Sequence, residues 1–266
     1  MSSTAAAIST VRSKAARARA KLDTYTGLRG AQAECPCCSA TFELFRHYSG
    51  RPRAACPNCG ARERHRALWL YLRDEVVVRR VPWTMLHFAP EPEISEKLRE
   101  VGALTYTTAD LEPGRADEAF DITAIPHPEG SFDLVLISHV LEHVPHDERA
   151  LAEIFRILTP GGRAILQHPI RYRSPTTYED FSITSEADRA THFGQFDHVR
   201  VYGRDFIERV RRAGFAVTHR RFEQERDFAT RMRYGLHEYT GDSMRGMDLY
   251  IAVKPDTGRR GDPAAT

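Results

Sequence analysis

The cysteines of this 266-residue chain are the residues whose spacing most directly indicates chemistry. All five, Cys35, Cys37, Cys38, Cys56 and Cys59, fall between positions 35 and 59. They form two short motifs, ECPCCS and ACPNCG, each of which contains a Cys-x-x-Cys pair. Two such pairs present four thiolates on two tight turns, a donor set that suits tetrahedral Zn²⁺. The spacing therefore predicts a zinc site formed by Cys35, Cys38, Cys56 and Cys59.

Four thiolate ligands fill the coordination sphere of zinc, so this site is predicted to be structural rather than catalytic. Cys37 is expected to stay outside it, since using Cys37 in place of Cys38 would give poorer loop geometry. A disulfide framework is disfavoured, because the cysteines are odd in number and concentrated in one short segment. Zinc-bound thiolates also indicate a reducing compartment, so we expect a cytoplasmic protein.

Two aspartates that follow predicted strands form the second group with chemical meaning. Asp110 lies at the end of the strand expected in the stretch LTYTTADL, as its second-last residue, where a carboxylate can accept hydrogen bonds from both hydroxyls of a ribose. Asp121, followed by Ile122, suits an adenine amino group beside an apolar wall. Either aspartate alone is also typical of a helix cap or a turn. Together they favour a nucleoside ligand.

Histidines supply the third group. The segment His139-Val-Leu-Glu142-His143 matches an H-x-x-E-H pattern found in one class of metalloproteases. That pattern requires a helix, whereas this segment begins at the end of an apolar strand. We therefore favour the alternative, in which His143 packs or forms hydrogen bonds beneath a bound cofactor. A count of two zinc ions per chain would favour the metal site.

Residues 168–200 form a connection that is long for a compact domain and is predicted to cover the substrate. His168 and His198 within it are the preferred candidates for taking a proton from the substrate. Each of them alone is also typical of a structural histidine. With His143, they complete the set of candidate catalytic residues.

These side chains need a scaffold, and the pattern of the chain supplies one. Short apolar strands alternate with amphipathic helices from Trp83 onward, which predicts an α/β domain with a mostly parallel sheet and helices on both faces. Ligands of such sheets bind beyond the carboxyl ends of the strands, where the aspartates and histidines occur. The expected strands are 84–90, 104–111, 131–138, 163–170, 215–222 and 247–255, and the expected helices are 93–101, 147–158 and 202–214.

Charge is unevenly distributed along the chain. Residues 1–80 contain 15 Lys and Arg against 6 Asp and Glu, while the whole chain has a net charge of only +2. The excess indicates either a surface that faces nucleic acid or a solvated face, and we favour the latter. The basic cluster Arg62, Arg64, His65 and Arg66 is equally compatible with phosphate binding and with the wet side of a connecting helix. No apolar run is long enough for a membrane span.

The stretches YTTADLEP, SFDLVLISHVLEHV and ILTPGGRAIL together resemble class I S-adenosylmethionine-dependent methyltransferases. The resemblance extends over about residues 83–254. The cysteine motifs, followed by ERHRALWLYL and LHFAPEP, also resemble a bacterial subgroup of these enzymes with an N-terminal cysteine-rich segment. The resemblance implies a Rossmann-like, seven-stranded sheet that binds S-adenosylmethionine through the residues His87, Ala89, Pro90, Glu91, Asp110, Leu111, Asp121, Ile122, Ser138 and His139.

The chain departs from this family at the loop after the first strand. The family carries an acidic residue and a Gly-x-Gly sequence there, whereas this chain reads LHFAPEP. His87 occupies the position of the acid, and no glycine is present. Ala89 is small enough to allow close approach of the cofactor, and Glu91 is expected to bind its methionine ammonium group.

The predicted organisation is a basic N-terminal arm or helix (1–30), a zinc ribbon (31–62), a connecting helix (63–82), a methyltransferase domain (83–256) and a disordered tail (257–266). The predicted function is methyl transfer from S-adenosylmethionine to an oxygen, nitrogen or carbon nucleophile of a small metabolite. One alternative is methylation of RNA held by the basic zinc module. Another is a zinc-ribbon interaction protein without catalytic activity. No membrane partner is expected, and the sequence does not indicate an oligomeric state.

Overall fold

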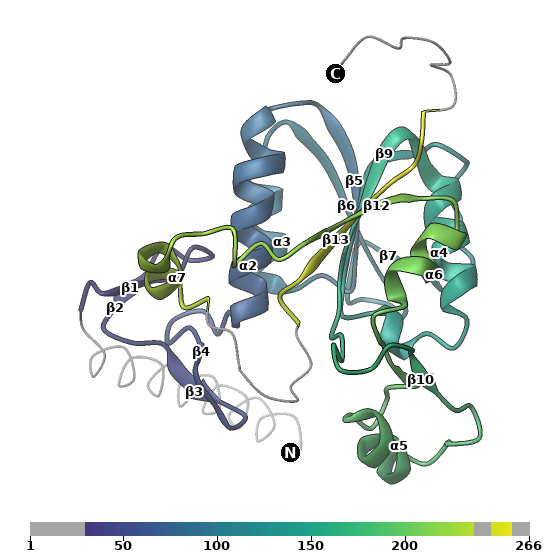
Figure 1. Ribbon diagram of the computed structural model, residues 1–266. Coiled ribbons are helices and arrows are strands. Elements are labelled where there is room, and N and C mark those ends of the chain that lie inside the picture. The colour runs from purple at the N-terminus through teal and green to yellow at the C-terminus, as the bar shows by residue number, and fades with distance from the viewer. Residues whose placement is uncertain (1–29, 237–245, 257–266) are drawn as a thin grey trace, which may run out of the picture. The chain divides into compact units, whose positions relative to one another are not determined.

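The computed structural model describes residues 30–236 and 246–256 of the chain (Figure 1). Contacts divide these residues into two compact units. The smaller unit contains residues 30–70 and 226–236, and the larger contains residues 71–225 and 246–256. The predicted N-terminal arm, apart from Gly30, and the predicted tail lie outside the described residues. Within the described part, no helix is long and apolar enough to cross a membrane.

The smaller unit consists of short hairpins and two helices. Two hairpins join antiparallel strands, one from β1 (Ala33–Glu34) and β2 (Thr41–Phe42) and one from β3 (Arg46–Tyr48) and β4 (Arg51–Ala55). They are followed by α2 (Glu63–Tyr71), whose last residue already belongs to the larger unit. The unit also includes α7 (Phe228–Tyr234), a segment that the predicted domain limits assign to the methyltransferase domain.

The guanidinium group of Arg66 connects these pieces of the smaller unit. It is fully buried and donates hydrogen bonds to the carbonyl oxygens of Ala54 and Ala61, and also to those of Tyr234 and Gly235 at the end of α7. Five donors on one rigid group can satisfy several orphan carbonyls at once, which a lysine cannot do. Arg66 is therefore a structural residue, and the phosphate-binding alternative does not apply to it.

A seven-stranded sheet forms the centre of the larger unit, as the resemblance implies. Its spatial order is β12-β13-β9-β8-β5-β6-β7. The strands from β9 to β7 are parallel to their neighbours, and β13 runs antiparallel to both β9 and β12. Their bounds are β5 (Trp83–Phe88), β6 (Leu104–Asp110), β7 (Glu118–Ala119), β8 (Phe132–Ser138), β9 (Leu158–Gln167), β12 (Ala216–Arg220) and β13 (Leu249–Val253).

Helices lie on both sides of this sheet because its central strands are apolar on both faces. Residues 134–138 of β8 are all buried, as is typical of a parallel strand covered twice. Figure 1 shows α3 (Pro92–Arg99) on one side and α4 (Asp147–Ile157) with α6 (Phe206–Arg212) on the other. The apolar residues of α4 recur at helical spacing, and Ala150, Leu151, Ile154 and Ile157 are buried.

The long connection after β9 is partly ordered into secondary structure. A short ladder pairs β10 (Tyr178–Glu179) with β11 (Arg200–Val201), and α5 (Glu186–Phe193) lies between them in the sequence. Ser185 caps the start of α5 by accepting a hydrogen bond from the backbone N–H of Asp188, and Gly194 ends the helix with a φ of 87°. The connection is therefore a structured insertion rather than an extended loop.

Candidate active site

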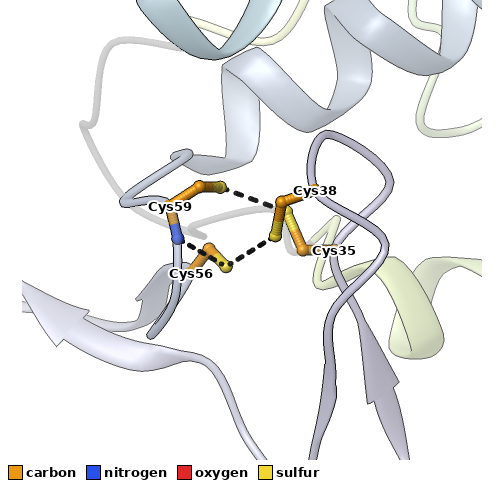
Figure 2. A group of neighbouring side chains, drawn as sticks. All are labelled: Cys35, Cys38, Cys56 and Cys59. Carbon is orange, nitrogen blue, oxygen red and sulfur yellow. Dashed lines mark hydrogen bonds between the residues drawn. The ribbon is translucent and has the colours of Figure 1, made fainter. Parts of the chain in front are cut away.

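The four predicted zinc ligands come together in the smaller unit (Figure 2). The sulfur atoms of Cys35 and Cys59 are 3.7 Å apart, and so are those of Cys38 and Cys56. This separation is far longer than the roughly 2.05 Å of a disulfide. Sulfurs bound tetrahedrally at about 2.3 Å from one zinc ion would lie about 3.8 Å apart. The cluster therefore has the spacing that zinc requires.

Both cysteine pairs lie on turns of the same construction. The N–H of Ser39 donates to the carbonyl of Cys35, and the N–H of Gly60 donates to the carbonyl of Cys56. Ser39 and Gly60 both adopt positive φ angles, of 58° and 82°. Backbone N–H groups of the second turn point toward the Cys56 sulfur, 3.4 Å from Asn58 and 3.5 Å from Cys59. Such donors stabilise thiolate charge.

Cys37 lies outside the cluster. Its side chain is buried, and its sulfur lies 3.7 Å from the carbonyl oxygen of His65. Sequence reasoning predicts this arrangement from loop geometry alone, because the residue next to Cys38 faces the other way in a tight turn.

A cavity of about 540 Å³ lies in the larger unit, beside the carboxyl ends of β5, β6 and β8. This is where an α/β sheet of this kind binds its ligand. Six of the ten residues predicted to bind cofactor line it: Ala89, Asp110, Leu111, Asp121, Ile122 and His139. Other lining residues that the sequence analysis does not single out are Phe88, Arg115, Phe120, Thr123, Val140, Val144, Pro145, His146 and Asp197.

Each of the two aspartates in the cavity has one carboxylate oxygen engaged in a local turn. Oδ1 of Asp110 accepts the backbone N–H of Glu112 at 2.9 Å. Oδ1 of Asp121 accepts the N–H and hydroxyl of Thr123, at 2.7 and 2.8 Å. These are the turn bonds expected of such aspartates. They fix the orientation of each carboxylate, and within the described part of the chain neither Oδ2 atom makes a hydrogen bond.

The loop after β5 achieves a glycine-type turn without a glycine. Ala89 has a φ of 46°, which lies in the left-handed region, and its N–H donates to the carbonyl of Ala109 on the neighbouring strand β6. A side chain with a Cβ pays about 1–2 kcal/mol in this region. Strain of this kind often marks a functional loop. Alanine is the smallest residue with a Cβ, so it keeps the backbone approachable at this cost.

Replacing Ala89 tests whether this strain is real. Ala89→Gly is expected to raise the free energy of unfolding by up to about 1 kcal/mol, because glycine removes the Cβ penalty. Ala89→Val is expected to lower it by about 1–2 kcal/mol, since a β-branched residue tolerates this region least. Urea unfolding measures both changes. The control is Ala103→Gly in the loop before β6, where φ is not positive, so that glycine relieves no strain and should lower the free energy of unfolding. An equal decrease in the free energy of unfolding for Ala89→Gly and Ala103→Gly would contradict strain at Ala89.

His87, Glu91 and Ser138 form a hydrogen-bonded chain rather than part of the cavity wall. His87 is fully buried, with Nδ1 2.7 Å from the hydroxyl of Tyr106 and Nε2 3.2 Å from Oε2 of Glu91. The hydroxyl of Ser138 donates to Oε1 of Glu91 at 2.5 Å. Both oxygens of Glu91 are thus held, Oε2 by His87, which occupies the position of the family's acid, and Oε1 by Ser138. Pro90 lines a separate cavity of about 320 Å³ beside α3.

The candidate catalytic histidines occupy different environments. His143 lines the 540 Å³ cavity, and its Nδ1 is 3.2 Å from Oδ2 of Asp197. His198 is buried next to it, with ring centroids 4.6 Å apart, and burial lowers its pKa. His168 is enclosed by Tyr202, Phe206 and Tyr250, and burial lowers its pKa to about 3. The structure therefore brings His143 and His198 together, and it buries His168 away from the cavity wall.

Comparison with known proteins identifies the larger unit. Residues 91–166 match the family described as "Methyltransferase domain". The match begins at Glu91, within the glycine-free loop, and extends through β6, α4 and most of β9. Residues 91–166, which lie in the unit that contains the seven-stranded sheet, are therefore similar to a methyltransferase domain.

The relatives of this segment are short local matches. The "Ubiquinone/menaquinone biosynthesis C-methyltransferase UbiE" of Methylobacterium nodulans is 51% identical over 55 residues, which are 20% of this chain and 22% of the relative. Its counterpart in Yersinia enterocolitica is 35% identical over 97 residues, which are 35% of this chain and 32% of the relative. The chain therefore spans less than a third of the length of either relative in these matches.

Solved structures agree on the fold. An "S-adenosylmethionine dependent methyltransferase" from Mesorhizobium loti has 19% sequence identity and a TM-score of 0.50, and the likeness covers 71% of this chain and 97% of that one. The "[4+2]-Cyclase SpnF" has 15% identity and a TM-score of 0.50, covering 88% and 92%. Likeness at these identities concerns the fold alone. A protein titled as a cyclase on this fold shows that chemistry has to be argued from the site.

Proposed function

We propose that this protein transfers the methyl group of S-adenosylmethionine to a small-molecule acceptor. The observation that carries the proposal is the position of Asp110 and Asp121 in one cavity at the carboxyl edge of a methyltransferase sheet. Each carboxylate is oriented by a turn and has one oxygen without a protein hydrogen bond among the described residues. Two such acceptors beside the apolar Ile122 suit the hydroxyls and the base of a nucleoside.

Different residues of the site would bind different parts of S-adenosylmethionine. Asp110 accepts the ribose hydroxyls, and Asp121 with Ile122 binds the adenine ring. Glu91 lies two residues after the cavity-lining Ala89 and not on the cavity wall itself; we assign its carboxylate to the methionine ammonium group, with His87 as a positioning residue because its Nε2 lies 3.2 Å from Oε2 of Glu91. S-adenosylmethionine, when bound, supplies an already activated methyl group, so that alignment with the acceptor accounts for much of the rate.

The acceptor is assigned to the histidine end of the cavity. His143, His146 and Asp197 line this end, and His139 joins it to the cofactor-binding residues. A hydroxyl acceptor has to lose its proton during methylation, whereas a neutral amine attacks without prior proton loss. An imidazole can take the proton directly, or a metal ion held by imidazoles can lower the pKa of the hydroxyl.

We assign the four-cysteine cluster to a structural zinc ion. The sulfur spacing and the all-cysteine donor set support this assignment. Four thiolates leave no open coordination position, so the zinc would stabilise the smaller unit and take no part in methyl transfer.

Formation of S-adenosylhomocysteine from S-adenosylmethionine in the presence of small acceptors tests the proposed activity. The full chain is incubated with pools of hydroxyl, amine and activated-carbon compounds, and in parallel with RNA. We expect turnover with a small acceptor, at a rate that changes little between about 50 and 200 mM salt. Turnover with RNA alone, falling steeply over that range, would contradict a small-molecule acceptor.

A further inference from the structure

Three potential metal ligands from two distant segments meet at the histidine end of the cavity. Glu142 and His143 belong to a single 3-10 turn, Leu141–His143, that follows β8. His198 comes from the end of the long connection, just before β11. One ligand atom from each of the three residues lies within 4.8 Å of the others. Two imidazoles and one carboxylate form a donor set that divalent transition metals bind with coordination positions left open.

The carboxylate of Glu142 is the observation that points to a ligand. Glu142 is 1% exposed, and among the described residues neither of its carboxylate oxygens is assigned a hydrogen-bond partner. Nδ1 of His139 lies 3.2 Å from Oε1, at ion-pair distance. A buried carboxylate without hydrogen bonds is costly, so such a group ordinarily has a partner that offsets its charge. His139 is one such partner for Oε1, and a divalent cation between Glu142, His143 and His198 would bind the carboxylate where Oε2 has no hydrogen bond among the described residues.

Buried contacts hold the two segments in place independently of any metal. The N–H of Val199 donates to the carbonyl of Glu142 at 3.0 Å. Arg200, which is 1% exposed, donates to the carbonyl oxygens of Leu141, Val144 and Pro145. The guanidinium group is itself held by Glu179 at 2.9 Å. The ligands are thus preorganised by the fold, as a specific metal site requires.

Asp197 adds the outer contact that ligating histidines commonly have. Its Oδ2 is 3.2 Å from Nδ1 of His143, and both residues line the cavity. A carboxylate in this position fixes the orientation of an imidazole and increases its basicity toward a metal. A stand-alone pair of packed histidines would need neither Asp197 nor the buried Glu142.

We propose that Glu142, His143 and His198 bind a divalent transition metal ion such as Zn²⁺. Because His143 lines the cavity, the open coordination positions of this ion face the cavity. The role of this site rests on the proposed methyl transfer. The metal ion selects an acceptor that has an oxygen donor, such as a hydroxyl, and it binds and orients that oxygen. The same ion would lower the pKa of a bound hydroxyl, so that its proton passes to solvent water and the resulting alkoxide oxygen receives the methyl group without a histidine base. This set of three ligands differs from that of the H-x-x-E-H hypothesis, because His198 takes the place of His139.

Cobalt substitution tests this site without any need for turnover. The metal-free full chain is titrated with Co²⁺ while metal content and visible absorption are followed. Thiolate-bound cobalt gives intense charge-transfer bands, whereas a site with two histidines and one glutamate gives weak ligand-field bands alone. We expect the chain to bind two equivalents of Co²⁺. One equivalent, at the four-cysteine cluster, should give charge-transfer bands, and the second, at Glu142, His143 and His198, should give only weak ligand-field bands. Uptake of a single equivalent by the wild-type chain would overturn the proposal.

Variants assign the second equivalent to its ligands. His143→Ala, His198→Ala and Glu142→Gln are each expected to lose it and to keep the charge-transfer bands of the cysteine site. His192→Ala is the matched control, because His192 is an exposed histidine of the same connection as His198 and belongs neither to the three-ligand group nor to the cavity wall. Circular dichroism and thermal unfolding show whether each variant is folded, independently of any binding to the cavity. Retention of the second equivalent by both histidine variants would also overturn the site, whereas absence of methyl transfer would leave the metal count unaffected.

Discussion

Replacing Cys56 with serine is expected to abolish zinc binding at the four-cysteine cluster and to unfold the smaller unit. Cys56 is fully buried, and its sulfur accepts from two backbone N–H groups and lies 3.7 Å from that of Cys38. Structural zinc contributes apparent binding free energies of about 10–16 kcal/mol, which exceeds the stability of most small domains. The strands of this unit are only two to five residues long and cannot replace that contribution.

Metal content and limited proteolysis of the full chain measure this effect. The Cys56→Ser variant should lose one zinc equivalent and become cleavable within residues 30–62. Cys37→Ser is the matched control, since Cys37 is equally buried but lies outside the cluster. It is expected to retain both zinc and protease resistance. Loss of zinc in the control and not in Cys56→Ser would contradict the assignment of ligands.

Replacing Asp110 with alanine is expected to weaken binding of S-adenosylhomocysteine by about 100-fold. Hydrogen bonds to a charged group contribute about 1.5–3 kcal/mol, and a carboxylate that binds two ribose hydroxyls loses both. The turn bond from the N–H of Glu112 is lost as well, but that N–H lies in an exposed loop and can bind water. The effect should therefore fall on the ligand more than on stability.

Isothermal titration calorimetry of the variant and a control measures this loss. Glu112→Ala removes a charge of the same sign two residues away, from a side chain that is 61% exposed and pairs with Arg115. It should bind S-adenosylhomocysteine within about threefold of the wild type, because exposed ion pairs contribute little. Equal weakening in both variants would mean that local charge, rather than ribose recognition, is responsible.

The parts of the fold that follow from local pattern were predictable from sequence. The strands β6 and β8 and the helices α4 and α6 lie within the expected segments, because each buries apolar residues at its own period. The strands β5 and β9 and the helix α3 overlap their expected segments but begin earlier, β9 by five residues because it already includes the TPGG sequence between the expected helix and the expected strand. The two-residue strand β7 has no such period. The helix α7 was also beyond prediction, since its place in the smaller unit depends on one buried arginine far away in sequence, Arg66.

The candidate site shows the same limit. Asp110, Asp121 and His139 could be placed at the cavity because each directly follows a strand or lies on the short loop after one. His87 precedes the last residue of β5 by one position, and side chains alternate between the two faces of a strand. Its side chain therefore lies on the face where it meets the hydroxyl of Tyr106, and not in the cavity. The meeting of Glu142 with His198 could not be predicted, since Arg200 and the β10–β11 ladder bring it about.

Binding of S-adenosylhomocysteine to the wild-type chain tests the central claim most directly. The claim is that the cavity at the carboxyl edge of the sheet binds this nucleoside despite the absence of the usual glycine loop. Calorimetry with the full chain is predicted to show saturable binding of one ligand per chain, with competition by S-adenosylmethionine. Absence of binding to a chain that is folded and loaded with zinc would contradict the claim.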